Sequence, residues 1–469
     1  MGRIIPRRFS ILRLLPVGSN TSRQRTSALW GLDLGDIAYL DEDVHREIYS
    51  RCNPELGDVL LTKDGANTGN VAINTLEEEF SLLSSVALLK LKRDTVDSRF
   101  VRYYLESPVG SKRLLGDMTG TAIRRIILRK IKETEIPVAP LDDQRRIVAE
   151  IEKQFTRLEA GVAALRRVQA NLKRYRAAVL KAACEGRLVP TEAELCGSGV
   201  PPLNHDSTAK PAFSKAGSKV STSPKRQDAA STFESGQQLL ARILTERRQN
   251  WQGRGSFVEP AAPDASSLPK LPIGWTWARV EQLSNVVRGA SPRPAGDPRF
   301  FGGNVPWITV GPLTADNSPY LKAVPASLNE LGCEHSRYIE PQTLLLTNSG
   351  ATLGVPKITL IGGCINDGVA ALLDVGYPLK LYLLYFLRTQ TEGLRGLNQG
   401  AAQPNLNTTI IKDIAVPLPP LAEQTRIVAE VERRLSVVEE LEAVVTTNLQ
   451  RATRLRQAVL QKAFSGELL

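Results

Sequence analysis

Cysteine and histidine are scarce in this chain, which has 5 cysteines and 3 histidines in 469 residues. The cysteines are scattered and none forms a CxxC pair, so we expect no disulfide framework and a reducing compartment. Cys333 and His335 lie close together, but no further cluster completes the four ligands of a zinc site. The sequence therefore predicts no structural metal.

Long apolar runs are also missing. No stretch approaches the roughly 18 consecutive apolar residues of a membrane-spanning helix. Arginines interrupt the apolar residues near the N-terminus, unlike the continuous apolar core of a signal peptide. A hydrophobic content of 42% is nevertheless enough for ordinary packed cores. We therefore expect a soluble, cytoplasmic protein.

Catalytic motifs are absent as well. The sequence has no GxxxxGK[ST] loop, and its GANTG and GATLG loops lack the lysine of a phosphate-binding loop. No GxGxxG follows an apolar run, which argues against a dinucleotide or methyl-donor site. The three histidines lie in unrelated contexts, and no arrangement of acid, base and nucleophile occurs in both halves. We expect a binding protein without catalytic residues.

What the sequence does contain is an internal repeat. Residues 136–189 align with residues 416–469 without a gap, and 20 of the 54 paired positions are identical. PVAPLDDQRRIVAEIE in the first copy returns 280 residues later as PLPPLAEQTRIVAEVE. This period is far longer than the roughly 20 to 50 residues of a solenoid repeat. Each half therefore consists of a globular domain followed by one copy of the repeated segment.

Both copies have the apolar spacing of a coiled-coil helix, with residues alternately three and four positions apart. The predicted seam of the first copy is Val148, Ile151, Phe155, Leu158, Val162, Leu165, Val168, Leu172, Tyr175 and Val179. That of the second is Val428, Val431, Leu435, Val438, Val445, Leu455 and Val459, with Glu442, Asn448 and Ala452 at seam positions where Leu441 and Leu449 can substitute. A helix over residues 142–185 would be roughly 65 Å long, too long for one globular core. Each helix therefore needs a partner, and its own duplicate is the nearest candidate.

The charges favour antiparallel pairing of these two helices. Acids gather in the first half of each copy and bases in the second, for example Glu159 and Glu439 against Arg176 and Arg456. Antiparallel packing sets acid against base twice, whereas parallel packing sets like against like. The same distribution also complements each helix dipole, and this alternative explains the charges equally well.

The chain divides into five parts. We predict globular domains at residues 1–135 and 269–415, long helices within 136–189 and 416–469, and a linker at 190–268 that contains a short helix at 234–252. Prolines before Leu141 and Leu421 favour an extended approach to each helix, and Gly186 and Gly466 fit helix ends. Residues 197–233 are rich in Ser, Ala, Pro, Gly and Lys, which is typical of a flexible linker.

Each globular domain has an apolar strand that runs into a glycine loop. DVLLTKDGANTG at residues 58–69 corresponds to TLLLTNSGATLG at residues 343–354. Another strand, an aromatic helix and a small-residue turn follow in the same order in both domains, although the residues differ more than in the helices. We expect α/β (α+β) domains in two pseudo-symmetric halves, with the loop glycines in turn conformations.

The net charge of +11 and the pI near 9.4 favour a polyanionic partner. Polar and basic side chains in the loops suit hydrogen bonds to base edges and phosphates, although each also fits a plain turn-forming role. The candidates in the first domain are Thr62, Lys63, Asn67, Thr121, Arg124 and Arg125. Those in the second domain are Arg288, Ser291, Arg293, Thr347, Asn348, Gln403 and Asn405.

The repeated PLxxQxRIV element, the preceding glycine loops and the segment LPIGWTWARVEQLSNVVRGASPRP closely resemble the specificity subunit of Type I restriction-modification systems. The resemblance covers nearly the whole chain. It implies two target-recognition domains held apart by two antiparallel helices, with each domain reading one half of a split, asymmetric double-stranded DNA target. The helices would fix the nonspecific spacer between the two half-sites.

The resemblance also implies partners. Two methyltransferase (modification) subunits would dock on the helices, where the partner-facing candidates are Gln144, Arg146, Glu150, Gln424, Arg426 and Glu430. These subunits and the endonuclease/translocase (restriction) subunits would supply the chemistry with S-adenosylmethionine, ATP and magnesium. This chain itself is expected to bind no cofactor.

The first domain departs from the pattern. It reaches Thr62 only 61 residues after Met1, whereas the second domain reaches Thr347 76 residues after Leu271 and opens with a Gly-Trp pair that the first lacks. The first domain is therefore N-terminally short. Two other functions are compatible with the residues: a coiled-coil scaffold with protein-binding heads, and an enzyme with a fused methyltransferase or nuclease, which the missing motifs make the least favoured.

Overall fold

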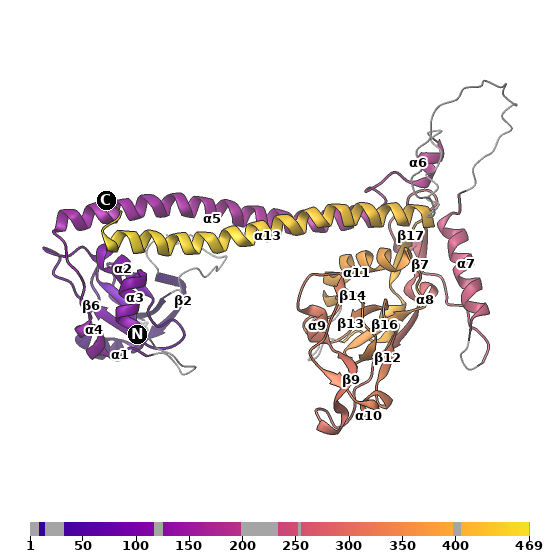
Figure 1. Cartoon of the computed structure of the whole chain (residues 1–469), viewed down its shortest axis with the longest axis horizontal. Helices are drawn as coiled ribbons and strands as arrows, with labels where there is room; N and C mark the ends of the chain where they lie inside the picture. Colours follow the sequence, from indigo (N-terminus) through magenta and orange to yellow (C-terminus); the bar gives the residue numbers. More distant parts are fainter. Residues whose placement is uncertain are drawn as a thin grey trace, which may run out of the picture. The chain divides into compact units, whose positions relative to one another are not determined.

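The computed structural model describes residues 9–14, 32–116, 125–197, 233–251, 255–396 and 405–468, with side chains from residue 39 onward. The chain forms two compact units, residues 1–169 with 443–469 and residues 170–442. Each unit combines one globular domain with one end of each long helix (Figure 1). In the described part of the chain, none of the helices combines the length and the apolar character that crossing a membrane requires.

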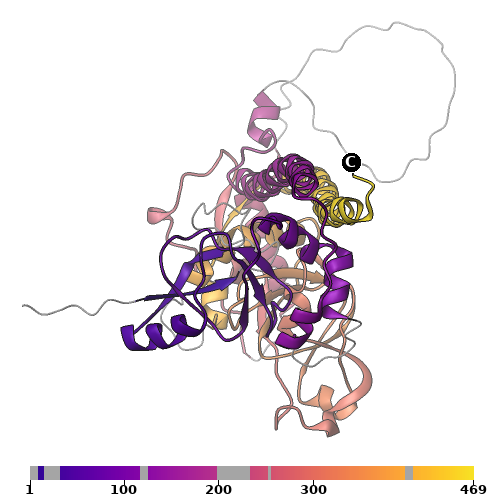
Figure 2. The same cartoon turned by 90° about the vertical axis from the view of Figure 1, so that its left-hand side faces the viewer.

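The two long helices are present as predicted. α5 (Leu141–Cys184) has 44 residues and α13 (Leu421–Ser465) has 45. The glycines that follow them, Gly186 and Gly466, have φ values of 68° and 83°, the left-handed conformation that ends a helix without strain. Figures 1 and 2 both show the helices side by side.

The helices run antiparallel within each unit, as the fold prediction required. In the first unit, Val148 and Phe155 near the start of α5 pack with Leu460 and Ala463 near the end of α13. In the second unit the roles are exchanged, and Val179 near the end of α5 packs in the cluster that contains the start of α13. Each apolar stripe is thus buried against the other copy of the repeat.

The predicted seam holds in part. Most of its positions are buried or half-buried, but four predicted seam side chains are 41–49% exposed: Val168, Tyr175, Leu441 and Leu455. Leu172 and Val179 are buried as predicted, but Gln169 and Arg176 take the inward positions that were predicted for Val168 and Tyr175, so the spacing of three and four continues past Leu165. The inward position is held by Arg176 in α5 and by Arg456 in α13, which are equivalent residues of the repeat.

These two arginines meet acids from the other helix. Arg176 Nη1 lies 3.8 Å from Glu439 Oε1, and Arg456 Nη1 lies 3.7 Å from Glu159 Oε1. Both pairs involve the same two repeat positions, since each number differs from its counterpart by 280. The guanidinium of Arg456 also covers the Phe155 ring at 4.1 Å. Acid therefore faces base in both units, as the charge pattern predicted.

The first domain contains two three-stranded sheets, with strand orders β2-β1-β5 and β4-β3-β6. The strands are β1 (Phe9–Leu14), β2 (Leu32–Leu40), β3 (Val59–Thr62), β4 (Val71–Ile73), β5 (Ser81–Leu82) and β6 (Val86–Leu89). The helices are α1 (Glu42–Arg51), α2 (Ser98–Glu106), α3 (Pro108–Leu115) and α4 (Leu128–Glu133). β3 is antiparallel to both β4 and β6 and is completely buried, so it forms the centre of this sheet.

The second domain contains a five-stranded sheet β10-β14-β13-β16-β8, a four-stranded sheet β11-β9-β15-β12 and the pair β17-β7. The strands are β7 (Thr276–Arg279), β8 (Asn285–Arg288), β9 (Phe301–Ile308), β10 (Tyr320–Leu321), β11 (Ser327–Leu328), β12 (Arg337–Ile339), β13 (Leu344–Thr347), β14 (Pro356–Thr359), β15 (Gly363–Ile365), β16 (Val369–Leu373) and β17 (Ala415–Leu418). The helices are α7 (Gly236–Gln249), α8 (Val280–Leu283), α9 (Val310–Thr314), α10 (Glu330–Glu334), α11 (Leu379–Gly396) and α12 (Thr408–Lys412), with 3-10 turns at Ala265–Ser267 and Pro298–Phe300.

The core of the second domain lies on both faces of its larger sheet. One face packs against α11 through Leu344, Leu346 and Leu383, and the other packs toward the smaller sheet through Leu345 and Ile365. Trp275 and Trp307 of this domain are buried, in two different hydrophobic clusters, whereas Trp277 is only half-buried.

The linker assignment needs one correction. Residues 234–252 were placed in the linker, but α7 is part of the second domain, since Leu239 is 2% exposed and packs in the same hydrophobic cluster as Trp275. Apolar residues spaced for one helical face predicted the helix, whereas the surface that covers it comes from distant strands. A further short helix, α6 (Glu192–Gly197), precedes the residues that the structure leaves undescribed.

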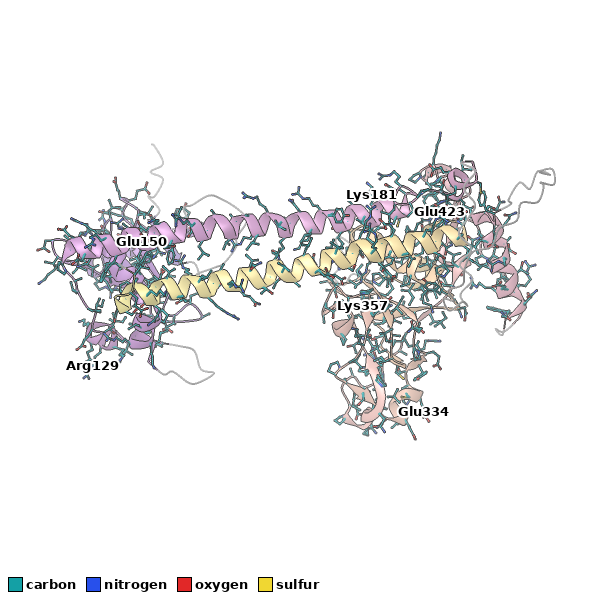
Figure 3. All side chains as sticks on the ribbon, turned by 45° about the horizontal axis from the view of Figure 1, so that its top comes forward. Arg129, Glu150, Lys181, Glu334, Lys357 and Glu423 are labelled. Atoms are coloured by element: carbon teal, nitrogen blue, oxygen red, sulfur yellow. The ribbon has the colours of Figure 1, made fainter. Side chains whose placement is uncertain are left out.

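The start of α13 contains a buried acid, Glu423. Its Oε1 accepts a hydrogen bond from Trp275 Nε1 at 2.9 Å, and its Oε2 accepts one from the backbone N–H of Glu192 at 3.2 Å. Arg426 bonds the Glu192 carboxylate and the Pro190 carbonyl, and so holds α6 beside the helix. Figure 3 places Glu423 on α13. Burial raises the pKa of Glu423 to about 7, although the hydrogen bonds from Trp275 and the Glu192 backbone act to lower this pKa.

We therefore predict that stability of the second unit falls between about pH 5 and pH 8. Because the folded-state pKa is raised, the stabilisation is complete below the ordinary glutamate pKa and is lost as pH rises through about 7. The expected loss is on the order of 1–3 kcal/mol. Urea unfolding followed by tryptophan fluorescence at both pH values measures it. In Glu423→Gln this pH dependence should be much reduced, and an equally steep dependence in the variant would contradict the assignment.

Candidate nucleic-acid interface

A glycine loop follows the central strand of each domain, and the backbone closes it in the same way. In the second domain Thr347 N donates to Val355 O (3.0 Å) and Gly354 N donates to Thr347 O (2.7 Å). In the first domain Thr62 N donates to Asn70 O and Gly69 N donates to Thr62 O, both at 2.8 Å. The loop glycines 65, 69, 350 and 354 all have positive φ, as predicted, which only glycine adopts without strain.

A second loop meets the glycine loop at the end of that strand. Ile126 N donates to Lys63 O and Leu406 N donates to Asn348 O, each at 2.7 Å. The neighbouring residues form isolated antiparallel bridges, Asp64 with Arg125 and Ser349 with Asn405. We call this meeting of two loops the loop junction. The sequence predictions at Thr121, Arg124 and Gln403 lie outside the described residues.

The loop junction of the first domain presents polar side chains at the surface. Lys63 and Asn67 are half-exposed and Arg125 is exposed. The Arg125 Nε lies 3.6 Å from Asp64 Oδ2, so this arginine is lightly paired across the junction. Three predicted residues of this domain therefore lie on the two loops that meet, from segments about 60 positions apart in the chain.

Two predicted threonines have a structural role. Thr347 is 0% exposed, and its hydroxyl donates to Thr352 O at 2.8 Å and accepts from Val355 N at 2.9 Å. Thr62 is 7% exposed at the equivalent position. The prediction that these side chains contact DNA directly is wrong, because both are buried at the end of the strand, beneath the loop that follows them.

Asn348 is completely buried, and neither its carboxamide oxygen nor its nitrogen has a hydrogen-bond partner among the described residues. The Asn366 carboxamide oxygen is also buried without a partner. Leaving such a group unsatisfied costs roughly 1–3 kcal/mol. Folds retain such costs mainly at functional sites. Asn405, in contrast, is exposed on the second loop.

The remaining candidates of the second domain converge on one acid. Ser291 Oγ donates to Asp367 Oδ1 at 2.7 Å, Arg293 Nη2 donates to Oδ2 at 3.1 Å, and Arg288 Nε donates to the Asp367 backbone oxygen at 2.8 Å. Asp367 lies in the turn between β15 and β16. Asp367 is not among the residues predicted from the sequence, although the Asn-Asp-Gly triplet between two apolar strands is a turn signal.

On the long helices, Gln144 and Gln424 are both 0% exposed. Gln144 accepts from Asp97 N and donates to Thr95 O and Ala139 O at 2.7–3.0 Å, which fixes the first domain to the start of α5. Gln424 donates to Pro419 O at 2.9 Å, the equivalent of the Ala139 contact. The prediction that these two residues face a partner is corrected, since their side chains hold the helix starts.

The other partner candidates differ in availability. Arg146 is exposed and pairs with Asp143 at 3.2 Å, whereas Glu150 of α5 (Figure 3) is half-buried and pairs with Lys153 at 3.0 Å. Arg433 and Arg434 bond Glu430 at 2.6–2.7 Å and lower its pKa to about 2. Arg426 is occupied by Glu192. Across the described ranges, no group of three or more His, Cys, Asp or Glu side chains has the arrangement of a metal site.

The Thr347 hydroxyl provides a test of the loop junction. Thr347→Val keeps the shape but leaves the Val355 N–H without its side-chain acceptor, which should cost about 1–3 kcal/mol locally. Amide hydrogen exchange of residues 348–356 should then rise roughly 5- to 100-fold. Thr347→Ser keeps the hydroxyl and is the matched control. Equal exchange in the Val variant and the wild type would show that the hydroxyl does not hold this loop.

Comparison with known proteins agrees with the repeated architecture. The family model for the Type I restriction modification DNA specificity domain matches residues 47–164 and 272–443, which together exceed half of the chain. Each matched region covers a large part of one globular domain and the first part of the long helix that follows it, although the first match begins only at residue 47, within α1.

Individual relatives match at 21–42% identity. The EcoBI specificity subunit of Escherichia coli is 21% identical over 403 residues, 82% of this chain and 68% of that subunit. The MjaIX specificity subunit of Methanocaldococcus jannaschii is 26% identical over 165 residues, 34% of this chain and 38% of that subunit. The StySPI specificity subunit of Salmonella potsdam is 42% identical over 112 residues, 23% of this chain and 24% of that subunit. The last two matches thus span less than half of those relatives.

The fold agrees with a solved structure. A chain from a type I restriction-modification system, solved for its complex assembly and conformational transition, aligns with a TM-score of 0.58 at 18% identity, over 98% of this chain and 92% of that one. The family model, two domains with the same loop junction and two repeated helices all agree. This chain belongs to the Type I restriction-modification DNA specificity family.

Proposed function

We propose that this chain is the non-catalytic DNA-recognition subunit of a Type I restriction-modification complex, and that its two domains read the two halves of a split, asymmetric target. The observation that carries the proposal is the loop junction, built twice by the same backbone hydrogen bonds but with different side chains. Lys63, Asp64 and Arg125 form it in one domain, where Asn348, Ser349 and Asn405 stand in the other. Two different sets of side chains on one frame suit two different half-sites.

The side chains at these junctions suit recognition of DNA. Lysine and arginine at the surface bind phosphates and guanine edges, and asparagine pairs with adenine in the major groove. Asn405 and Arg125 are exposed on the second loop of each junction. The net charge of +11 would strengthen association with the DNA backbone and make it dependent on salt.

The long helices would carry the partners. α13 exposes Val437, Leu441 and Val444 by 44–55%, spaced three and four apart on one side of the helix. Arg146 and Glu150 of α5 and Glu430 of α13 would add charged contacts on each helix for the two methyltransferase subunits. Those subunits and the restriction subunits would bind S-adenosylmethionine, ATP and magnesium, so this chain would need no cofactor.

DNA footprinting tests the proposal. The full chain, combined with its methyltransferase subunits, should enrich one class of sequence from random duplexes and protect two short tracts separated by an unprotected spacer. Arg125→Ala should weaken one tract and Asn405→Ala the other, with each variant serving as the control of its counterpart. Enrichment of no sequence, or protection of one short continuous tract, would instead favour a scaffold with protein-binding heads.

We also propose that the helices set the spacer. One heptad inserted after Leu165 in α5 and another after Gln450 in α13 would keep the apolar seam in phase, since Glu159 faces Arg456 in this unit. The helices would lengthen by about 10 Å, close to three base pairs of DNA. Selection from random duplexes should return the same half-sites with a spacer about three base pairs longer. An unchanged spacer would contradict a ruler role.

A further inference from the structure

Asp367 joins the arginine cluster of the second domain to its loop junction. The register pairs Arg288 with Ala370 and Thr347 with Val369, so the end of β8, the start of β16 and the end of β13 lie side by side at one end of the strands. The turn that contains Asp367 lies at this end of the sheet. Its next residue, Gly368, accepts a hydrogen bond from Asn348 N at 2.9 Å. The acid therefore stands between the two groups of candidate DNA contacts.

The geometry around Asp367 fixes its carboxylate and holds an arginine. Ser291 binds one carboxylate oxygen at 2.7 Å, and Arg293 binds the other at 3.1 Å. The Arg293 side chain is nevertheless 70% exposed, and that of Asp367 is 41% exposed. A guanidinium has five N–H donors, so Arg293 keeps donors for a ligand after bonding Asp367.

An acid at this position is unfavourable for simple phosphate binding. Asp367 offsets one of the two positive charges of Arg288 and Arg293, and a carboxylate repels a nearby phosphate. A guanine edge has different requirements. Its O6 and N7 accept two parallel hydrogen bonds from one guanidinium, so the plane of the arginine must be correctly oriented. An arginine side chain that is already held in this orientation before DNA binds loses less conformational entropy on binding.

We propose that Asp367 is a positioning residue that orients Arg293 to read a guanine in the half-site of the second domain. The proposal rests on the function proposed above and specifies the base that one side chain recognises. Arg293 contacts the guanine, whereas Asp367 acts through Arg293.

The test compares positional base preference. Full-length wild type and the Asp367→Asn and Arg293→Ala variants, each with the methyltransferase subunits, select from random duplexes. Both variants should lose about tenfold preference for guanine at the same single position, and the double variant should lose no more than either alone. The half-site of the first domain and the other positions of the second half-site should be unchanged in every variant, which shows that both domains are folded. Replacing that guanine by 7-deazaguanine, which lacks N7, should weaken wild-type binding but have little effect on Asp367→Asn.

Glu234→Gln is the matched control. Glu234 binds Arg242 at 2.8 and 3.0 Å in another exposed ion pair. Arg242 lines a cavity with Asn285 and Leu373, which pair with each other at the opposite end of strands β8 and β16. Base preference should therefore be unchanged in this variant.

Two results would overturn the inference while leaving the proposed function intact. One is an Asp367→Asn variant that keeps the wild-type preference at every position. The other is a variant that loses affinity equally for all sequences with an altered salt dependence, since this would assign the cluster to phosphate contact. If the wild type selects no sequence, the proposed function itself fails, and the two failures are therefore distinguishable.

Discussion

The antiparallel pairing of α5 with α13 is the constraint on which the rest of the structure depends. A helix of 44 residues with an apolar stripe cannot bury that stripe in one small domain, so it needs a partner of similar length. The repeat supplies one. At equivalent positions of the two copies, Arg176 and Arg456 turn inward and meet Glu439 and Glu159. Other registers would leave these half-buried arginines without acids, so the pairs favour one alignment of the helices.

The start of each helix is also where a globular domain is attached. Gln144 bonds the backbone before α2, which fixes the first domain to α5. In the second domain Glu423 attaches the start of α13 by accepting hydrogen bonds from Trp275 and from the backbone of Glu192. The two copies thus share their helix starts but use different neighbours. A carboxylate in this buried position has a raised pKa, which makes attachment of the second domain sensitive to pH.

The two domains share a frame made of backbone hydrogen bonds. The contacts that close the glycine loops and join the second loop to the strand use N–H and C=O groups, which every residue except proline provides. Side chains at the junction are therefore free to differ, and they do: Lys63 stands where Asn348 stands in the other domain. Glycines remain at the left-handed positions because other residues would be strained there. Because backbone groups hold the shared frame, the two domains can keep it while their side chains differ. This explains why the two copies of the sequence are similar in the helices and much less similar in the domains.

The duplication, the two long helices, their antiparallel charge match and the glycine loops could be predicted from the sequence, because these features depend on local spacing and on the left-handed freedom of glycine. Arg288, Ser291 and Arg293 were also among the candidate contacts predicted from the sequence. The three-dimensional fold was needed to show that Asp367 holds these three side chains together, that Thr347 is buried and that α7 packs on the second domain. Each of these outcomes depends on contacts between segments far apart in the chain. Residue type and local periodicity carry no information about which distant surface a side chain will meet.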